Sequence, residues 1–427
     1  MRGQPNVPGL LILDWDPRYR SYVLEACLAL GIEAHLVMRE APAELPAGAV
    51  RVHVLPGLYD DPLQWVGELA RYVRLHGLAG VFTHEDELVV LSAALSDELG
   101  FPGASLPAVR LCMDKAATRD RFAAAGVPGP RYRVAASLDE ARQALAELTL
   151  PVVLKPVAAS GGQGVTRLTD ASALPQAWEW AVEPYGYLPA VYHRVIIEEF
   201  LEGPLVSVEA AVVDGEVHVV TATDGLQTIE PVGPTQSRFV YDALLVPTRL
   251  PAEDYEAMAH WTREAVRALG IRTGIVHTEF KRTPHGVRIV EVNPRLPGVY
   301  IPELVHRALG VDLAGAALQL ALGRRPDLAQ KHRGAACARL LLARESGEVH
   351  AVEGADEAAA APHVVRACLF VEPGDVVAPP HEGDIEVRLG YVLTEHSDPH
   401  GALSAADEAL ARIAVRIAEP GAVREVR

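Results

Sequence analysis

The sequence predicts two fold classes in one chain, an α/β part followed by an α+β part. Strand and helix patterns alternate over the first hundred residues, an order typical of a parallel sheet covered by helices. Two hairpin patterns, at 205–221 and 275–293, predict antiparallel pairing further along the chain. With 427 residues, the chain is long enough for more than one hydrophobic core.

A first domain over residues 1–105 follows from short apolar runs that alternate with helical periodicity. The runs predict strands at 9–14, 34–38, 52–55 and 80–83, and the periodicity predicts helices at 22–30, 63–75 and 85–99. Gly31 is expected to end the first helix. No GxGxxG follows the first strand, so the dinucleotide-binding fingerprint is missing.

Residues 106–203 are expected to form a linker helix and a small α+β unit. One long helix is predicted at 107–125, followed by a Pro- and Gly-rich breaker at 127–130. The unit itself is predicted to contain strands at 151–155, 165–168 and 195–199 and helices at 137–148 and 172–182. Ser137 followed by Glu140 is a capping-box pattern and marks the start of the first of these helices.

Two further domains are expected, at 204–330 and 331–427. The first would contain a hairpin that turns at Asp214-Gly215, a helix at 254–269 and the hairpin at 275–293. The second is predicted to hold three or four strands and a final helix at 404–418.

Net charge and cysteine spacing exclude or disfavour several classes of function. Lys and Arg number 39 against 56 Asp and Glu, a net charge of −17, which disfavours sequence-independent nucleic-acid binding. The four cysteines are far apart and form no CxxC pair, so a zinc ribbon and a thioredoxin-like motif are excluded. Scattered thiols and the lack of a signal peptide or long apolar run predict a cytoplasmic protein that does not engage a membrane.

The hairpin at 275–293 carries the strongest chemical signal. Alternation places His277 and Glu279 on one face, and Glu291, Asn293 and Arg295 also share one. A three-residue loop with Gly286 in the left-handed region would set Glu279 directly opposite Glu291. Facing carboxylates destabilise a sheet unless a cation lies between them, and hard oxygen ligands suit Mg²⁺ shared with phosphates. A hairpin with a polar solvent face is the plainer interpretation.

Three weaker motifs accompany this hairpin. A strand delivers Lys155, and the loop at 160–164 is rich in glycine, which lets backbone N–H groups approach phosphate. The segment 114–119 reads Asp-Lys-Ala-Ala-Thr-Arg, and 195–204 is an apolar strand that ends in acidic residues and a turn. Taken singly, these are typical of a hairpin turn, a solvated helix face and a strand end.

In combination and in this order, the motifs resemble the ATP-grasp superfamily. They are Asp114-Lys115-x-x-x-Arg119, Lys155-Pro156 with its glycine loop, Glu198-Glu199-Phe200-Leu201-x-Gly203, and Glu279 with Glu291-x-Asn293-x-Arg295. Residues 277–280 and 292–295 most resemble the L-amino-acid-ligase group of carboxylate–amine ligases. The tail resembles the C-terminal subdomain that this group shares with biotin carboxylase. The resemblance covers roughly residues 1–420.

The resemblance implies an ATP-grasp fold with four parts. These are an N-terminal Rossmann-like parallel-sheet domain, a lid subdomain, a central antiparallel sheet and a C-terminal β-rich subdomain. It implies ATP as cosubstrate with two Mg²⁺ ions, or Mn²⁺ in their place. The implied ATP contacts are Lys115 and Lys155 at the α- and β-phosphates, Ser160, Gly161, Gly162 and Gly164 in the lid loop, and Glu198, Glu199, Phe200 and Leu201 at adenine. The implied metal ligands are Glu279, Glu291 and Asn293, with His277 and Arg295 at the reacting groups.

The implied activity is ATP-dependent amide or peptide bond formation through an acyl phosphate, with release of ADP and phosphate. The expected partners are small molecules, an amino acid or other carboxylate and an amine, and a homodimer is left open. Another ATP-grasp enzyme, such as a carboxylase subunit or a purine-pathway ligase, is the alternative, and a non-catalytic ATP-binding module is a third. The segment 296–300 after Arg295 departs from the biotin carboxylase pattern and counts against that alternative.

Two departures from the family pattern concern ribose and substrate. Leu205 stands where many members have a ribose-binding Glu after Gly-Pro. The Glu-x-Gly-His substrate motif lacks its His here, although Glu230 remains in a Pro- and Gly-rich stretch that we expect to be a loop. We predict that Glu230 binds the amino group of the first substrate, and that Arg238 or Arg295 binds a carboxylate. Solvated loop charges are the plainer interpretation of Glu230 and Arg238.

Overall fold

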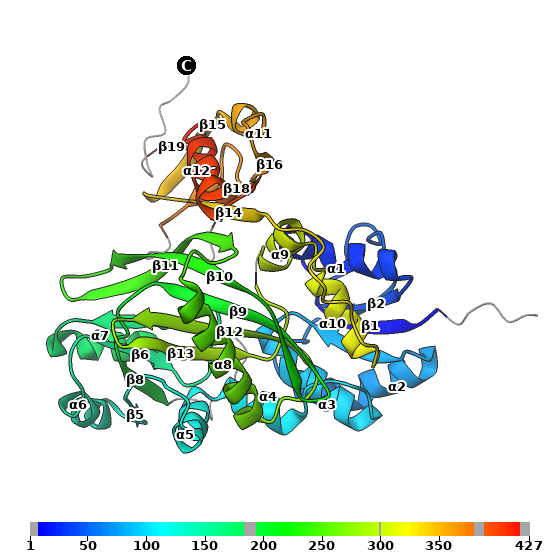
Figure 1. Ribbon diagram of the computed structural model, residues 1–427, viewed down its shortest axis with the longest axis horizontal. Helices are drawn as coiled ribbons and strands as arrows, with labels where there is room; N and C mark the ends of the chain where they lie inside the picture. The colour runs from blue at the N-terminus through cyan, green and yellow to red at the C-terminus, as the bar shows by residue number, and fades with distance from the viewer. Residues whose placement is uncertain (1–6, 183–193, 299, 380–387, 419–427) are drawn as a thin grey trace, which may run out of the picture.

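The computed structural model describes residues 7–182, 194–298, 300–379 and 388–418. Three sheets organise this part of the chain: a parallel N-terminal sheet, a large sheet that runs through the middle, and a small C-terminal sheet. Figure 1 shows the N-terminal strands in blue beside α9 and α10, the large sheet in green, and the C-terminal strands above it. This arrangement confirms the predicted mixture of α/β and α+β.

The N-terminal sheet is parallel with the order β3-β2-β1-β4. Its strands are β1 (Gly9–Leu13), β2 (Glu33–Met38), β3 (Ala49–Val54) and β4 (Gly80–Thr83), and its helices are α1 (Pro17–Leu30), α2 (Val66–His76) and α3 (Val89–Leu99). The side chains of β1 and β4 are buried along their whole length, as expected for strands covered on both faces. The carboxyl ends of β1 and β4 adjoin where the strand order reverses, which is the usual place for a site in such sheets.

The large sheet combines the lid unit, the central strands and part of the C-terminal region in one order, β13-β12-β9-β10-β11-β7-β6-β8-β5, with β14, β16 and β18 attached through β11. The lid contributes β5 (Tyr132–Ala135), β6 (Val152–Pro156), β7 (Thr166–Leu168), β8 (Val195–Glu199), α6 (Leu138–Ala146) and α7 (Leu174–Val182). The centre contributes β9 (Leu205–Val213), β10 (Glu216–Pro231), β11 (Gln236–Val246), β12 (Gly274–Thr283) and β13 (Gly286–Asn293), with α8 (Ala252–Leu269) packed against it.

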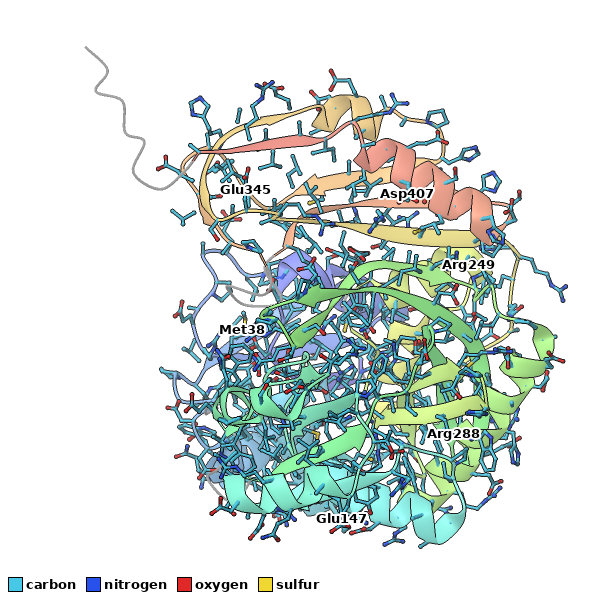
Figure 2. The ribbon with its side chains drawn as sticks, turned by 90° about the vertical axis from the view of Figure 1, so that its left-hand side faces the viewer. Met38, Glu147, Arg249, Arg288, Glu345 and Asp407 are labelled. Atoms are coloured by element: carbon cyan, nitrogen blue, oxygen red, sulfur yellow. The ribbon has the colours of Figure 1, made fainter. Side chains whose placement is uncertain are left out.

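The C-terminal region follows α9 (Ile301–Leu309) and α10 (Leu313–Ala321). Its described elements are β14 (Ala335–Leu342), β15 (Gly347–Glu353), α11 (Ala355–Ala359), β16 (Val364–Leu369), β17 (Val376–Val377), β18 (Arg388–His396), α12 (Pro399–Leu410) and β19 (Ala414–Ala418). In Figure 2, Asp407 on α12 lies at one end of the molecule and Glu147, at the end of α6 in the lid, lies at the other. The largest apolar core joins α1, α9 and α10 to the large sheet.

The long helix predicted at 107–125 is wrong, because the chain breaks at Asp114. Two helices form instead, α4 (Leu106–Met113) and α5 (Lys115–Ala125). Asp114 has extended backbone angles, and its side chain accepts a hydrogen bond from Ala117 N at 2.9 Å. An Asp that caps a new helix competes with continuation of the old one, and helical periodicity alone does not reveal this competition.

Three further predictions need correction. The predicted helix at 404–418 ends at Leu410, and 414–418 forms β19, which pairs with β15 and packs Val415 and Ile417 against the small sheet. The expected loop around Glu230 is a strand end, because β10 reaches Pro231 and Glu230 pairs with Arg238 on β11. The tail also holds more strands than the three or four expected, β14 to β19 among the described residues.

We predict that Asp114→Ala lowers the free energy of unfolding by about 1 kcal/mol, the usual cost of losing an N-cap. The same carboxylate also accepts from Arg194 at 2.8 Å, and this ion pair adds little because the Arg194 side chain is exposed to solvent. Chemical denaturation measures the change. Asp114→Asn keeps a side chain that can cap and should stay near wild type, and a loss as large as that of Asp114→Ala would contradict the capping explanation.

Candidate active site

A cavity of about 910 Å³ opens between the lid, the central sheet, the N-terminal domain and the C-terminal strands. Most residues predicted for the site meet here although they come from distant parts of the chain. Those that line the cavity are Lys115, Lys155, Ser160, Gly161, Gly162, Glu198, Glu199, Phe200, Leu201, His277, Glu279, Glu291 and Arg295.

Glu279 and Glu291 face each other across the β12–β13 ladder, as predicted. The predicted route to this register, a three-residue loop, is wrong. The strands pair up to Thr283 and Gly286, which leaves a two-residue turn, and an irregularity beside Val290 then shifts the register by one residue. Without that shift, Glu291 would lie opposite Thr278 and point to the other face of the sheet. Val290 and Glu291 both line the cavity.

Lys115 neutralises one of the two facing carboxylates. Its Nζ lies 2.9 Å from Glu291 Oε1 and donates to the Ala159 carbonyl oxygen at 2.7 Å. Because Lys115 is the first residue of α5, the break at Asp114 is what places it there. Burial raises the pKa of Glu291, but Lys115, with Lys155 and Arg295, outweighs burial and lowers the pKa to about 2.

Lys155 and Arg119 share one buried carboxylate. Lys155 Nζ and Arg119 Nε each lie 2.6 Å from an oxygen of Glu198, and all three side chains are less than a tenth exposed. Burial would raise the pKa of Glu198, but the two cations lower it overall. Arg119 Nη2 also donates to the Val290 carbonyl oxygen at 2.6 Å, at the irregular point of β13. One arginine therefore joins α5, β8 and β13.

His277 lies between two glutamates. Its Nδ1 is 2.9 Å from Glu209 Oε2, and its Nε2 is 3.4 Å from Glu279 Oε1. Burial lowers the pKa of His277, but Glu209 and Glu279 more than offset burial and raise the pKa to about 10. The imidazole is therefore cationic at neutral pH. Tyr241 adds a weak contact from its hydroxyl to Glu279 Oε1 at 3.5 Å.

Arg295 carries its charge next to the N-terminal domain. Its guanidinium bonds both carboxylate oxygens of Asp86, with Nη2 at 2.6 Å from Oδ2. Burial lowers the pKa of Arg295, but Asp86 raises it overall, so the group stays charged. Asp86 follows β4, so this ion pair links the carboxyl edge of the parallel sheet to the loop after β13.

The glycine loop approaches the same domain. Gly161, Gly162 and Gly164 have φ of 59°, 76° and 67°, angles that favour glycine. Gly164 does not line the cavity, and a Cβ there would come within 2.9 Å of Pro156. Ser160 Oγ donates to Glu87 Oε1 at 2.9 Å, so the loop is tied to the N-terminal domain.

An apolar slot adjoins these charges at the end of β8. Val153, Phe200 and Leu201 line the cavity there, and Phe239 stacks near Phe200 with ring centroids 6.1 Å apart and planes inclined by 17°. Ile197, on the same strand, is fully buried in the lid core and does not line the cavity. A flat, apolar group such as a purine base fits a slot of this composition.

The donors at Glu279, Glu291 and Asn293 fit a magnesium ion that is shared with a ligand. Carboxylate and amide oxygens are its preferred donors, and Mg²⁺ beside phosphates takes one or two protein carboxylates. The described residues contain no group of three or more His, Cys, Asp or Glu that could hold a metal ion. Asn293 pairs with His277 in the ladder but does not line the cavity.

Glu230 and Arg238 lie outside the residues that line the cavity. Glu230 Oε1 accepts from Arg344 at 3.1 Å, and the Arg238 guanidinium lies 4.9 Å from the centre of the Trp180 ring. They would have to move to contact a substrate in the cavity, and their role in recognition stays a prediction.

Sequence reasoning did not assign Arg119, Glu209, Asp86 or Tyr241 to the site. Arg119 belongs to the 114–119 segment, whose pattern is typical of a solvated helix face, but the structure buries its side chain. Glu209 had a usable signal, because a carboxylate within the apolar run Leu205–Val213 needs a partner. Asp86 had none, since its partner Arg295 is 209 residues away.

Comparisons with known proteins concern the family and the fold of the chain. The model of the ATP-grasp domain matches residues 148–303, and the model of the L-amino acid ligase C-terminal domain 2 matches residues 339–418. The crystal structure of an L-amino acid ligase from Bacillus licheniformis superposes with a TM-score of 0.81 at 21% identity, over 96% of this chain and 99% of that one.

Curated relatives are similar over part of their lengths. An uncharacterised protein of Sinorhizobium fredii is 34% identical over 77% of this chain and 66% of its own length. Human carnosine synthase 1 is 28% identical over 76% of this chain and 41% of its own length. A D-alanine–D-alanine ligase of Gloeobacter violaceus is 32% identical over 51% of this chain and 72% of its own length. The chain thus spans two thirds or less of the first two relatives.

We predict that Arg119→Met destabilises the fold by about 2–3 kcal/mol, because Glu198 keeps Lys155 but Glu198 and the Val290 carbonyl each lose a buried donor. Arg119→Lys keeps a charge for Glu198 but cannot fork to the Val290 carbonyl, and it should lose clearly less. Denaturant unfolding of both variants beside wild type measures the difference. An Arg119→Met variant within 1 kcal/mol of wild type would show that the shared carboxylate is not important for stability.

Proposed function

Because this chain belongs to the ATP-grasp superfamily, in the group that resembles L-amino-acid ligases, we propose that it is an ATP-dependent carboxylate–amine ligase. The observation that carries the proposal is the cavity, which gathers two lysines, a glycine loop, a facing glutamate pair and Arg295. That set can neutralise a polyphosphate next to an attacking carboxylate. No helix among the described residues is long and apolar enough to span a bilayer.

The proposed reaction has two steps. In the first, an oxygen of the substrate carboxylate forms a bond to the γ-phosphorus of ATP, the bond to the β,γ-bridging oxygen breaks, and an acyl phosphate and ADP result. In the second, an amine nitrogen attacks the acyl carbon, the bond to the phosphate oxygen breaks, and phosphate and a proton are released. Both reactants of the first step are anions, so charge neutralisation should contribute most of the rate.

Lys115 and Lys155 would hold the phosphates, each by exchanging part of its present contact with a glutamate. Glu279, Glu291 and Asn293 would hold Mg²⁺, which when bound offsets phosphate charge and orients the γ-phosphate. With that ion on Glu279, His277 would keep Glu209 as its partner and present its Nε2 proton to the transferred phosphoryl group. Arg295, held by Asp86, would neutralise the carboxylate side.

The loop at 160–164 would act as the lid over the phosphates. Its bond from Ser160 to Glu87 ties it to the N-terminal domain, which closes one side of the cavity. Exclusion of water protects an acyl phosphate from hydrolysis before the amine arrives.

The first test is ADP release with amino-acid mixtures. The proposed ligase should release ADP and phosphate only when both a carboxylate and an amine substrate are present, with a new amide detected by mass spectrometry. Turnover that needs bicarbonate instead of an amine would favour the carboxylase alternative. Nucleotide binding without turnover in any mixture of amino acids, small carboxylates and amines would favour the non-catalytic module.

We predict that Glu291→Gln lowers turnover by about 100-fold or more, the scale for loss of one preorganised charge-stabilising group. Nucleotide affinity should fall less, because the apolar slot and both lysines remain. Steady-state turnover and equilibrium ADP binding separate the two effects. Glu348→Gln, on the exposed face of β15, serves as the matched control. Ordinary turnover with Mg²⁺ in the Glu291 variant would overturn the metal assignment.

A further inference from the structure

The pairing of β9 with β12 gives the order in which residues follow one another along the cavity. Leu205 pairs with Lys281, Ser207 with Glu279, and Glu209 with His277. Side chains two residues apart share a face and lie about 6.8 Å from each other along a strand. Lys281, Glu279 and His277 therefore form a row on one face, and all three line the cavity.

The Lys281 end of this row is the end next to the apolar slot. The chain leaves β8 through Phe200 and Leu201 and reaches Leu205 by a turn at Gly203. This turn packs directly on β12, because Arg282 N donates to the Pro204 carbonyl oxygen at 3.1 Å. Gly203 has a φ of 130°, and a Cβ there would come within 1.9 Å of the Arg282 carbonyl oxygen.

A nucleotide must follow the same order, since its ribose connects the base to the phosphates. With the base in the apolar slot and the phosphates near Glu279, the ribose lies beside Lys281. Gln227 on β10 lines the cavity at this point, and its Oε1 accepts from Lys281 Nζ at 3.4 Å. Lys281 Nζ also lies 5.9 Å from the centre of the Phe239 ring.

The acidic side chains near the slot, Glu198 and Glu199, already have hydrogen-bond partners within the protein. Glu198 is shared by Lys155 and Arg119, and Glu199 accepts from Arg131 at 3.0 Å and from Thr149 N at 3.3 Å. Leu205, at the start of β9, is apolar and buried. Gln227 and Lys281 are polar and line this part of the cavity. The hydrogen bond between them uses one N–H donor, so their other donors remain available to a ligand.

We infer that Lys281 and Gln227 bind the 2′- and 3′-hydroxyls of the nucleotide ribose, and this inference rests on the proposed function. The ammonium group has three donors and spends one on Gln227, and the Gln227 amide has two donors of its own. The ribose oxygens would therefore act mainly as acceptors. A carboxylate at this place would instead require the hydroxyls to donate.

The test compares ADP, 2′-deoxy-ADP and 3′-deoxy-ADP in equilibrium binding to the full chain with Mg²⁺. Wild type should bind ADP about 10-fold or more tightly than at least one deoxy analogue, the range expected for a hydrogen bond to a charged donor. In Lys281→Met and Gln227→Ala, that ratio should fall below about threefold because ADP loses affinity while the analogue does not. Lys281→Arg keeps donors and should retain most of the ratio.

Lys331→Met and Gln64→Ala, outside the cavity, are the matched controls and should keep the wild-type ratio. A ratio that stays at its wild-type value in both cavity variants would overturn the inference, as would a wild type without discrimination. Equal weakening of all three nucleotides would overturn it too, by placing Lys281 at the phosphates. A wild type that binds none of the nucleotides would instead contradict the proposed function. Unfolding midpoints show whether each variant is folded. If Lys281→Met does not fold, Gln227→Ala and Lys281→Arg still test the inference.

Discussion

The carboxylate of Glu198 holds the cavity together. It accepts from Lys155 on β6 and Arg119 on α5, and Arg119 reaches on to the carbonyl of Val290 on β13. Buried charges require partners, so Glu198 needs at least one of these two cations in place. The lid, the linker helix and the strand that carries Glu291 are thereby kept in one arrangement. The apolar cores of the lid and of the central sheet are separate, which makes this polar link between them more important.

Four cations of the cavity are each paired with a carboxylate. Lys115 is paired with Glu291, Lys155 with Glu198, His277 with Glu209, and Arg295 with Asp86. Such pairing lets a chain with a net charge of −17 keep a group of buried cations where a polyanion is to bind. A ligand with phosphates would then replace internal carboxylates as the partner of the lysines, so binding involves an exchange of ion pairs.

Much of the fold and part of the site follow from short-range regularities. The parallel N-terminal sheet and the hairpins rest on apolar runs, turn residues and the two-residue period of a strand. The opposition of Glu279 and Glu291 was predicted correctly, but it depends on the register shift beside Val290, which that period does not reveal. Arg119 and Asp86 could not be assigned, because their partners lie 79 and 209 residues away and the pattern around them is that of a surface. The break at Asp114 and the strand at 414–418 depend on a cap and on pairing with β15, which override local periodicity.

The register shift beside Val290 affects how other chains with this pair of glutamates can be found from sequence. The eleven residues from 280 to 290 separate the facing glutamates, and an odd separation can be absorbed in either of two ways. A three-residue turn with a regular ladder and a two-residue turn with one bulged residue both set the same side chains opposite each other. The count between the glutamates is therefore a firmer search criterion than the composition or length of the turn. Alignments that place a one-residue gap in the turn rather than beside Val290 describe the same pair of carboxylates.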